Sequence, residues 1–181
     1  DDITLDQKYS TICGYTQDDV ERVFAKHLAG QDFGKIREWY NGYKWLGEGV
    51  YNPFDILLFI SKNFEFRNYW FSTATPTFLL KLIEKNNYFL PDLENIIKDD
   101  MMLDSFDVDY IELETLMWQT GYLTIESTID TPRGVRYKLA MPNREVRLSI
   151  FGAIASFISR QSNAVKHQDS LYDKLYAGDM R

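Results

Sequence analysis

Few residues of this 181-residue chain have the types and spacing that chemistry requires. Residues 30–36 (GQDFGKI) come nearest to a phosphate-binding loop, in which backbone amides hold phosphates and a hydroxyl reaches Mg²⁺. The stretch has one spacer residue too few, and Ile36 stands where the hydroxyl is needed. A turn between two helices is the ordinary interpretation, so we do not expect phosphates to bind here.

Metal and nucleophile chemistry find no matching pattern either. His27 and His167 are far apart and lack the spacing of a zinc site. Cys13 is the one cysteine, which excludes an internal disulfide framework and favours an inert thiol. An acidic stretch lacks the glycine and the terminal Glu of a calcium loop; it contains Asp99, Asp100, Asp104, Asp107 and Asp109. We expect no catalytic residue and no metal site, with an enzyme built from distant residues as an alternative.

The composition is that of a folded protein. Hydrophobic residues make up 45% and aromatic residues 15% of the chain, which excludes general disorder. No apolar run reaches the roughly 18 residues of a membrane span, and the net charge of -7 argues against indiscriminate nucleic-acid binding. We expect a cytoplasmic protein of one large or two small domains, without membrane contact.

Two aromatic stretches, residues 39–43 (WYNGY) and 51–54 (YNPF), are the most distinctive part of the sequence. Turns normally use small polar residues, so a turn this aromatic is either buried or binds something. In the buried interpretation the large aromatics belong to the core, and Asn41 and Asn52 cap helices. In the binding interpretation the aromatics stack on a ligand, and the asparagines offer it a donor and an acceptor.

Most of the chain reads as helices with clear start residues. Thr16 followed by Asp19 is a capping box, and Asn52 before Pro53 is a cap with proline at the first helical position. Apolar residues at helical spacing follow these starts. The pattern predicts helices over about residues 16–30 and 32–40, after Asn52, after Thr75-Pro76, and, more weakly, over 90–98 and 110–119.

The pattern changes after Gly121. Residues 122–125 and 135–139 are β-rich and flank the turn 130–134, which predicts one hairpin. Asn143 then caps a long helix. Helix, hairpin and helix together indicate a winged-helix-like unit, so we predict a mainly α fold in which a helical region precedes a winged-helix-like unit with one β-hairpin.

Basic residues gather in this last unit. Residues 131–147 contain one acidic residue and five basic ones, namely Arg133, Arg136, Lys138, Arg144 and Arg147. The wing and the adjacent helix of a winged helix are the parts that can meet a phosphate backbone. A solvated hairpin, a nucleic-acid contact and an acidic protein partner are all consistent with this charge.

Four blocks in order carry a resemblance: residues 38–43 (EWYNGY), 50–54 (VYNPF), 118–123 (WQTGYL) and 142–147 (PNREVR), with 14–16 (GYT) and 177–179 (AGD) in support. Together they resemble the predicted AAA-ATPase-like family of prokaryotes over nearly the whole chain. The resemblance implies a P-loop ATPase core, then a helical lid and a winged-helix-like region, often followed by a PD-(D/E)XK nuclease-type domain.

By this resemblance the chain corresponds to the middle of such a protein. Residues 1–109 would form the helical lid-like region, 110–161 the winged-helix-like unit, and 162–181 a linker and the start of a truncated element. The ATPase and nuclease motifs of the family have no matching positions here. We therefore expect a non-catalytic chain without a cofactor of its own, whose partners are the ATPase core and the downstream domain of the same polypeptide, with ATP as the nucleotide of the full-length protein.

The resemblance also implies where the lid would meet a nucleotide base. In related ATPases the lid closes over the base with a turn and the start of a helix, which here would be Tyr40, Asn41, Gly42, Tyr43, Tyr51, Asn52 and Pro53. The expected role is to couple the nucleotide state to a partner or to the following domain. The alternative is a winged-helix module that binds nucleic acid through the basic hairpin.

Overall fold

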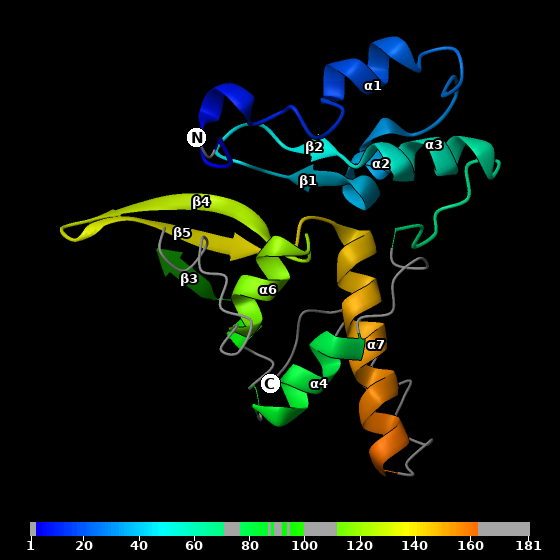
Figure 1. Ribbon diagram of the computed structural model, residues 1–181. Helices are drawn as coiled ribbons and strands as arrows, with labels where there is room; N and C mark the ends of the chain where they lie inside the picture. The colour runs from blue at the N-terminus through cyan, green and yellow to red at the C-terminus, as the bar shows by residue number, and fades with distance from the viewer. Residues whose placement is uncertain are drawn as a thin grey trace.

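The computed structural model describes residues 3–70, 77–86, 88, 92–93, 95–99 and 112–162, with side chains as far as residue 159. Figure 1 shows the elements in these ranges. The helices are η1 (Gln7–Tyr9), α1 (Gln17–Val23), α2 (Phe33–Tyr40), α3 (Pro53–Ser61), α4 (Thr77–Lys85), α6 (Leu113–Gln119) and α7 (Arg144–Ser162). The strands are β1 (Asn41–Tyr43), β2 (Val50–Tyr51), β3 (Ile96–Asp99), β4 (Thr124–Thr131) and β5 (Gly134–Ala140).

The expectation of a mainly α fold is wrong, because the described residues form a mixed α/β structure. They contain two antiparallel sheets, one with the order β1-β2 and one with the order β3-β5-β4. Strand β3 lies where a helix over 90–98 was predicted. Ile96 pairs with Leu139 and Asp99 with Arg136, so pairing with a distant strand outweighs a weak local helix pattern.

The N-terminal helix starts agree with the sequence. The hydroxyl of Thr16 accepts a hydrogen bond from Asp19 N at 3.1 Å, and the Asp19 carboxylate accepts one from Thr16 N at 3.0 Å. This reciprocal pair is the predicted capping box. Helix α1 nevertheless ends at Val23 rather than near Gly30.

The other two predicted caps are also present. Asn52 Oδ1 accepts from Phe54 N at 3.0 Å, with Pro53 at the first position of α3. Asn143 Oδ1 accepts from Val146 N at 3.0 Å at the start of α7. Each cap satisfies a backbone N–H that the helix itself leaves unbonded. Local sequence therefore sets where these helices begin.

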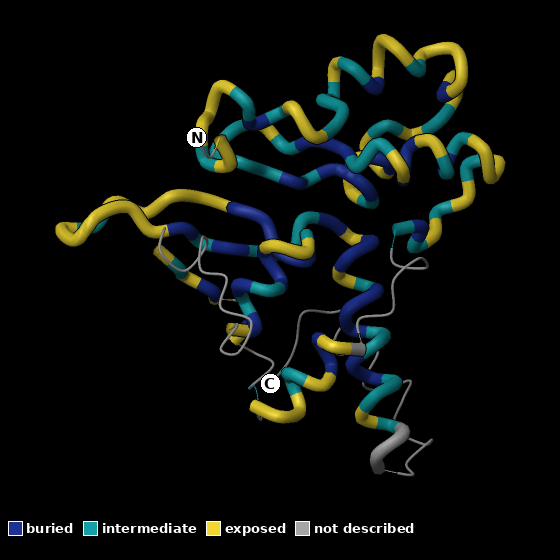
Figure 2. The backbone as a smooth tube through the Cα atoms, in the orientation of Figure 1, coloured by how far each residue is buried: buried dark blue, intermediate teal, exposed yellow. Residues whose placement is uncertain are grey.

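The predicted hairpin is confirmed and is longer than expected. Strands β4 and β5 pair from Thr124 with Ala140 to Thr131 with Gly134, and the hairpin projects from the body of the molecule in Figure 1. The Thr131 hydroxyl donates to Gly134 O at 2.7 Å and closes the turn. The outer half of the hairpin is exposed on both strands (Figure 2).

Two hydrophobic clusters divide the described residues into lobes. The N-terminal lobe, from η1 to Trp70, has a core of Val20, Leu28, Ile36, Tyr40, Tyr51, Ile56, Phe59 and Tyr69. The C-terminal lobe, from α4 to α7, has a larger core to which α4, α6, α7 and strands β3 to β5 contribute. Tyr43 and Val50, from the β1-β2 sheet, pack in that second core. The small sheet therefore joins the lobes, and most of its residues are buried (Figure 2).

The division into 1–109, 110–161 and 162–181 stays a prediction, because its first boundary and residues 163–181 lie outside the described ranges. Strand β3 nonetheless packs with the later elements rather than with the N-terminal core, since Ile96 belongs to the second cluster. Among the described helices, none is long and apolar enough to cross a membrane. The cellular compartment stays a prediction.

Backbone contacts fix β1 against the C-terminal lobe. Gly42 has φ of 129°, and a Cβ there would overlap the carbonyl oxygen of Pro142. Both facts require glycine: the first by conformation and the second by space. Arg144 Nη1, at the start of α7, lies 2.9 Å from Glu38 Oε1 on α2. The aromatic turn of the sequence is thus the junction of the two lobes.

Candidate functional site

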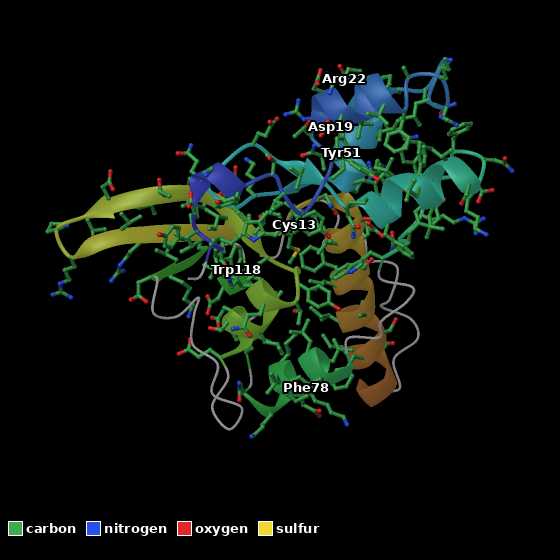
Figure 3. All side chains as sticks on the ribbon, turned by 45° about the horizontal axis from the view of Figure 1, so that its top comes forward. Cys13, Asp19, Arg22, Tyr51, Phe78 and Trp118 are labelled. Atoms are coloured by element: carbon green, nitrogen blue, oxygen red, sulfur yellow. The ribbon has the colours of Figure 1, made fainter. Side chains whose placement is uncertain are left out.

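An aromatic pocket of about 320 Å³ opens at the junction of the lobes. The N-terminal lobe contributes Cys13, the β1-β2 region and Trp70, and the C-terminal lobe contributes the end of α6. Figure 3 labels Cys13, in the turn between η1 and α1, and Trp118, on α6. The lining residues are Cys13, Tyr43, Trp45, Val50, Tyr51, Asn52, Pro53, Trp70, Gln119, Thr120 and Gly121. Its volume is near the lower end of the roughly 300–1,000 Å³ of small-molecule sites.

Large rings dominate the walls of the aromatic pocket. Tyr43 and Trp45 lie nearly parallel, with ring centroids 6.5 Å apart and planes at 16°. Trp70 packs on Tyr122 with centroids 5.1 Å apart. A Cβ at Gly121 would lie 3.8 Å from atoms of both Trp70 and Tyr43, so this glycine sits between the two walls. Such ring faces suit a planar ligand.

Four of the seven predicted base-contacting residues line this pocket: Tyr43, Tyr51, Asn52 and Pro53. Tyr51 itself is fully buried, and its hydroxyl donates to Gln17 Oε1 at 2.6 Å. Burial raises the pKa of Tyr51 to about 12. Its ring therefore supports the wall from the N-terminal core, and the more open surface comes from Tyr43 and its neighbours.

The other three predicted residues lie elsewhere. Tyr40 is fully buried, and its hydroxyl donates to Arg67 O and accepts from Arg67 N, both at 3.1 Å. Asn41 and Gly42 line a separate cavity of about 320 Å³ on the side of Pro142. The structure thus brings four of the seven predicted residues to one pocket and places the other three outside it.

The capping interpretation of the asparagines describes the same residues well. Asn52 is the N-cap of α3, and Asn41 occupies the C-cap position of α2. Tyr43 is buried, as the core interpretation requires, whereas Phe54 is 44% exposed and does not belong to the core. A cap and a pocket residue are compatible roles for Asn52, because its Oδ1 makes the cap while the residue also lines the pocket.

Two fully buried carboxyl groups meet beside the aromatic pocket. Asp55 lies in the first turn of α3, and Glu145 lies in the first turn of α7. The two side chains lie close enough for each to affect the pKa of the other. Glu145 Oε1 also accepts a hydrogen bond of 2.8 Å from the backbone N–H of Trp70. We call Asp55 and Glu145 the acid pair; it joins the two lobes next to a pocket wall.

Burial governs the electrostatics of the acid pair. Loss of solvent raises the pKa of Glu145 well above its ordinary value, and the neighbouring Asp55 carboxylate raises it further. Burial also raises the pKa of Asp55. Beside the pair, burial raises the pKa of the Tyr43 hydroxyl. The whole cluster favours proton-bound, neutral forms.

No local sequence pattern indicates the acid pair. An Asp or Glu in the first turn of a helix ordinarily interacts with the helix dipole in solvent. In the sequence, Glu145 is distinguished only as the single acidic residue among the basic residues of the segment 131–147. The pairing follows from packing α3 against the start of α7, two elements that no local pattern brings together.

The five basic residues differ in their surroundings. Lys138 Nζ lies 2.6 Å from Glu126 Oε2 on the paired strand. Arg144 pairs with Glu38 and lies over the ring of Trp39, 5.2 Å from its centroid. The remaining arginines are exposed, with Arg133 in the hairpin turn, Arg136 on β5 and Arg147 on α7. Carboxylates thus accompany two of the five cations.

The other residues considered for chemistry are dispersed. Cys13 is exposed at the rim of the aromatic pocket, and His27 is exposed beyond α1. Of the five aspartates only Asp99 is described, and His167 lies outside the described ranges. Within those ranges, no three His, Cys, Asp or Glu residues are arranged to hold a metal ion.

Comparison with known proteins gives one informative relative. The chain is 46% identical over 180 residues to an uncharacterized protein in the vnfD 5' region of Azotobacter chroococcum mcd 1. The alignment covers 99% of this chain and 35% of the relative, so the chain spans about a third of that protein's length. No family model and no solved structure matches the chain. The AAA-ATPase-like relationship therefore stays a prediction.

Proposed function

We propose that this chain is the lid and winged-helix-like part of a longer ATP-binding protein, and that its aromatic pocket receives the base of the nucleotide. The observation that carries the proposal is the convergence of Tyr43, Tyr51, Asn52 and Pro53 on one pocket. All four are among the seven positions that the resemblance implies for contact with the base. The rings of Trp45 and Trp70 add stacking surface to the same pocket.

The chemistry of the lining suits a heterocyclic base better than a phosphate. Tyr43, Trp45 and Trp70 offer ring faces, and Asn52 and Gln119 bring amide groups that can donate and accept hydrogen bonds. The lining contains no lysine or arginine in the part of the chain that the structure describes. The phosphates would then be held by another segment of the longer polypeptide, as a P-loop core would do.

The position of the pocket supports a coupling role. Its walls come from the β1-β2 region and Trp70, which precede α4 in the chain but pack in or against the second core, and from the end of α6. A base bound between these walls would favour one arrangement of the lobes over others. The strand order β3-β5-β4, with α6 between β3 and β4 in the chain, fits the winged-helix-like part of the proposal. The chain aligns with 35% of the length of its relative, which is consistent with a longer parent protein.

Calorimetry and NMR titration of the 181-residue chain test this proposal. We expect adenosine and ATP to bind with similar, weak affinity, at roughly millimolar Kd, because the chain holds only the base. Tripolyphosphate should not compete. Trp45→Ala should weaken binding, whereas Trp39→Phe, outside the pocket, should not. Micromolar ATP binding that tripolyphosphate abolishes, or no shift of pocket resonances with either ligand, would overturn it.

A nucleic-acid contact is the second candidate, favoured by the exposed Arg133 and Arg136 on the projecting hairpin. Against it, α6 contains no basic residue, and Glu112 at its N-cap and Glu114 in its first turn pair with Lys98. Anisotropy with duplex DNA at low and high salt separates the candidates, because a phosphate contact is salt-dependent. Binding that disappears when Arg133, Arg136 and Lys138 are changed to Glu would favour the hairpin.

A further inference from the structure

Two walls of the aromatic pocket are held by the same buried acids. The Trp70 ring lines the pocket, and its backbone N–H donates to Glu145 Oε1 at 2.8 Å. The Tyr43 ring lines the pocket as well, and its buried hydroxyl lies in the field of both carboxyls. Asp55 and Glu145 thus contact or face both walls without lining the pocket themselves.

The acid pair has no cation to balance it among the described residues. Tyr40 on α2, Tyr43 on β1 and Tyr69 after α3 are the titratable side chains that interact with its charge. No lysine, arginine or histidine contributes to the electrostatics of Asp55 or Glu145. Both residues are 0% exposed, so solvent does not screen the charges. Two ionised carboxylates in such a place would repel each other strongly.

One bound proton removes the repulsion between the two carboxylates. If both groups were ionised, neither could donate, and both Asp55 oxygens and Glu145 Oε2 would be buried without a hydrogen-bond donor. A proton placed between the two converts the contact into an O–H···O⁻ hydrogen bond, which is short and strong. The single remaining charge receives the Trp70 N–H and the favourable dipoles of α3 and α7, whose first turns hold the two acids.

We propose that Asp55 and Glu145 share one proton, and that this protonated pair is the positioning device that holds Trp70 opposite Tyr43 in the aromatic pocket. Loss of the proton leaves two adjacent buried charges. Their repulsion separates the starts of α3 and α7 and releases the Trp70 segment, which opens the pocket. The pocket is therefore ordered at neutral pH and loosens in alkaline solution. Any effect on ligand affinity rests on the proposed function, whereas the effect on Trp70 does not.

Fluorine NMR of the 5-fluorotryptophan-labelled chain tests the device, because it resolves the four tryptophans, each assigned with a Trp→Phe variant. Between about pH 6 and pH 10 we expect the Trp70 resonance to shift in one titration step, while that of Trp39 stays in place. In Glu145→Gln the amide donates to Asp55 and still accepts from Trp70 N–H. That variant should hold the Trp70 resonance at its neutral-pH position throughout.

Two further variants complete the test. In Asp55→Asn the new amide donates to Glu145, so this variant should also abolish the titration step of Trp70. It keeps the test valid if Glu145→Gln fails to fold. Glu114→Gln changes a carboxyl on α6 that pairs with Lys98, and it should leave the step intact. A Trp70 step that persists in both pair variants, or its absence from the unmodified chain, overturns the proposal.

The outcome is separable from that of the proposed function. A Trp70 step without adenosine binding would leave the acid pair as a positioning device and remove the base-binding role. Adenosine binding without a Trp70 step would keep the base-binding role and remove the acid pair as a positioning device. If both hold, adenosine affinity should fall over the same pH interval as the resonance shifts.

Discussion

The hydroxyl of Thr124 exchanges two hydrogen bonds with the backbone of Lys44. Lys44 N donates to Thr124 Oγ1 at 2.6 Å, and that hydroxyl donates to Lys44 O at 3.0 Å. The residues are 80 positions apart in the chain. Lys44 follows β1 and Thr124 begins β4, so one side chain satisfies both backbone groups of a residue in the other lobe.

This exchange makes Thr124→Val a sharp test of how the lobes adhere. Valine keeps the shape of threonine but leaves the N–H and C=O of Lys44 without their partner. We expect a loss of about 1–3 kcal/mol in the free energy of unfolding, measured in urea. Thr124→Ser retains the hydroxyl and should lose less. Equal stability of the two variants would show that water replaces the bonds without cost.

Gly42 offers a second test at the same junction. Alanine there would be strained at φ of 129°, and its Cβ would overlap Pro142 O. Gly134 is a matched control, because its φ of 119° imposes similar strain while nothing lies within 4 Å of a Cβ. We expect Gly134→Ala to lower the unfolding free energy by about 1 kcal/mol and Gly42→Ala by clearly more. Thermal unfolding followed by circular dichroism measures both, and similar losses would contradict the close approach.

The sequence predicted the helix starts because caps are local. Thr16, Asn52 and Asn143 each bond to a backbone N–H within three residues, so the relevant chemistry lies in a few adjacent letters. The hairpin was predictable for the same reason. Strand β3 was not, because Ile96 acquires its conformation from pairing with Leu139, far along the chain. Helix ends were also less predictable than starts, since α1 ends at Val23 without a glycine.

In the candidate site, too, local features were predictable and long-range contacts were not. The sequence singled out Tyr43 and Asn52, because aromatic turns are unusual, and both line the pocket. It could not find Trp70 or Gln119, since each reaches the pocket through packing between the lobes. Nor could it find the acid pair, because Asp55 and Glu145 each look like an ordinary acid in a first helical turn. Spacing rules apply within one helix or strand, so they do not predict contacts between lobes.

The capping box of α1 should respond to acid. Hydrogen bonds from Thr16 N and the Thr16 hydroxyl lower the pKa of Asp19. A lowered pKa means that the folded state binds the proton less tightly than the unfolded chain. Its contribution is therefore present above the ordinary pKa of about 3.8 and is lost as the pH falls through the folded value. Protection factors for amide exchange at the start of α1, which correct for the intrinsic pH dependence of exchange, should fall in acid, and Asp19→Asn should remove this dependence.

The acid pair should act in the opposite direction. The pKa of Glu145 is raised from 4.5 to about 9, so the folded state binds the proton more tightly than the unfolded chain. Its contribution is fully present below pH 4.5 and declines as the pH rises toward the folded value. The slope can reach about 1.4 kcal/mol per pH unit, the limit for one proton.

Urea unfolding of the unmodified chain and of Glu145→Gln, measured at several pH values from slightly acidic to alkaline, checks this decline. Subtracting the two curves isolates the pair from every other group that titrates in the same interval. The unmodified chain should lose stability relative to Glu145→Gln as the pH rises, because only it must give up a buried proton. Glu114→Gln should keep the slope of the unmodified chain. Parallel curves for the unmodified chain and Glu145→Gln would show that no proton is held between Asp55 and Glu145.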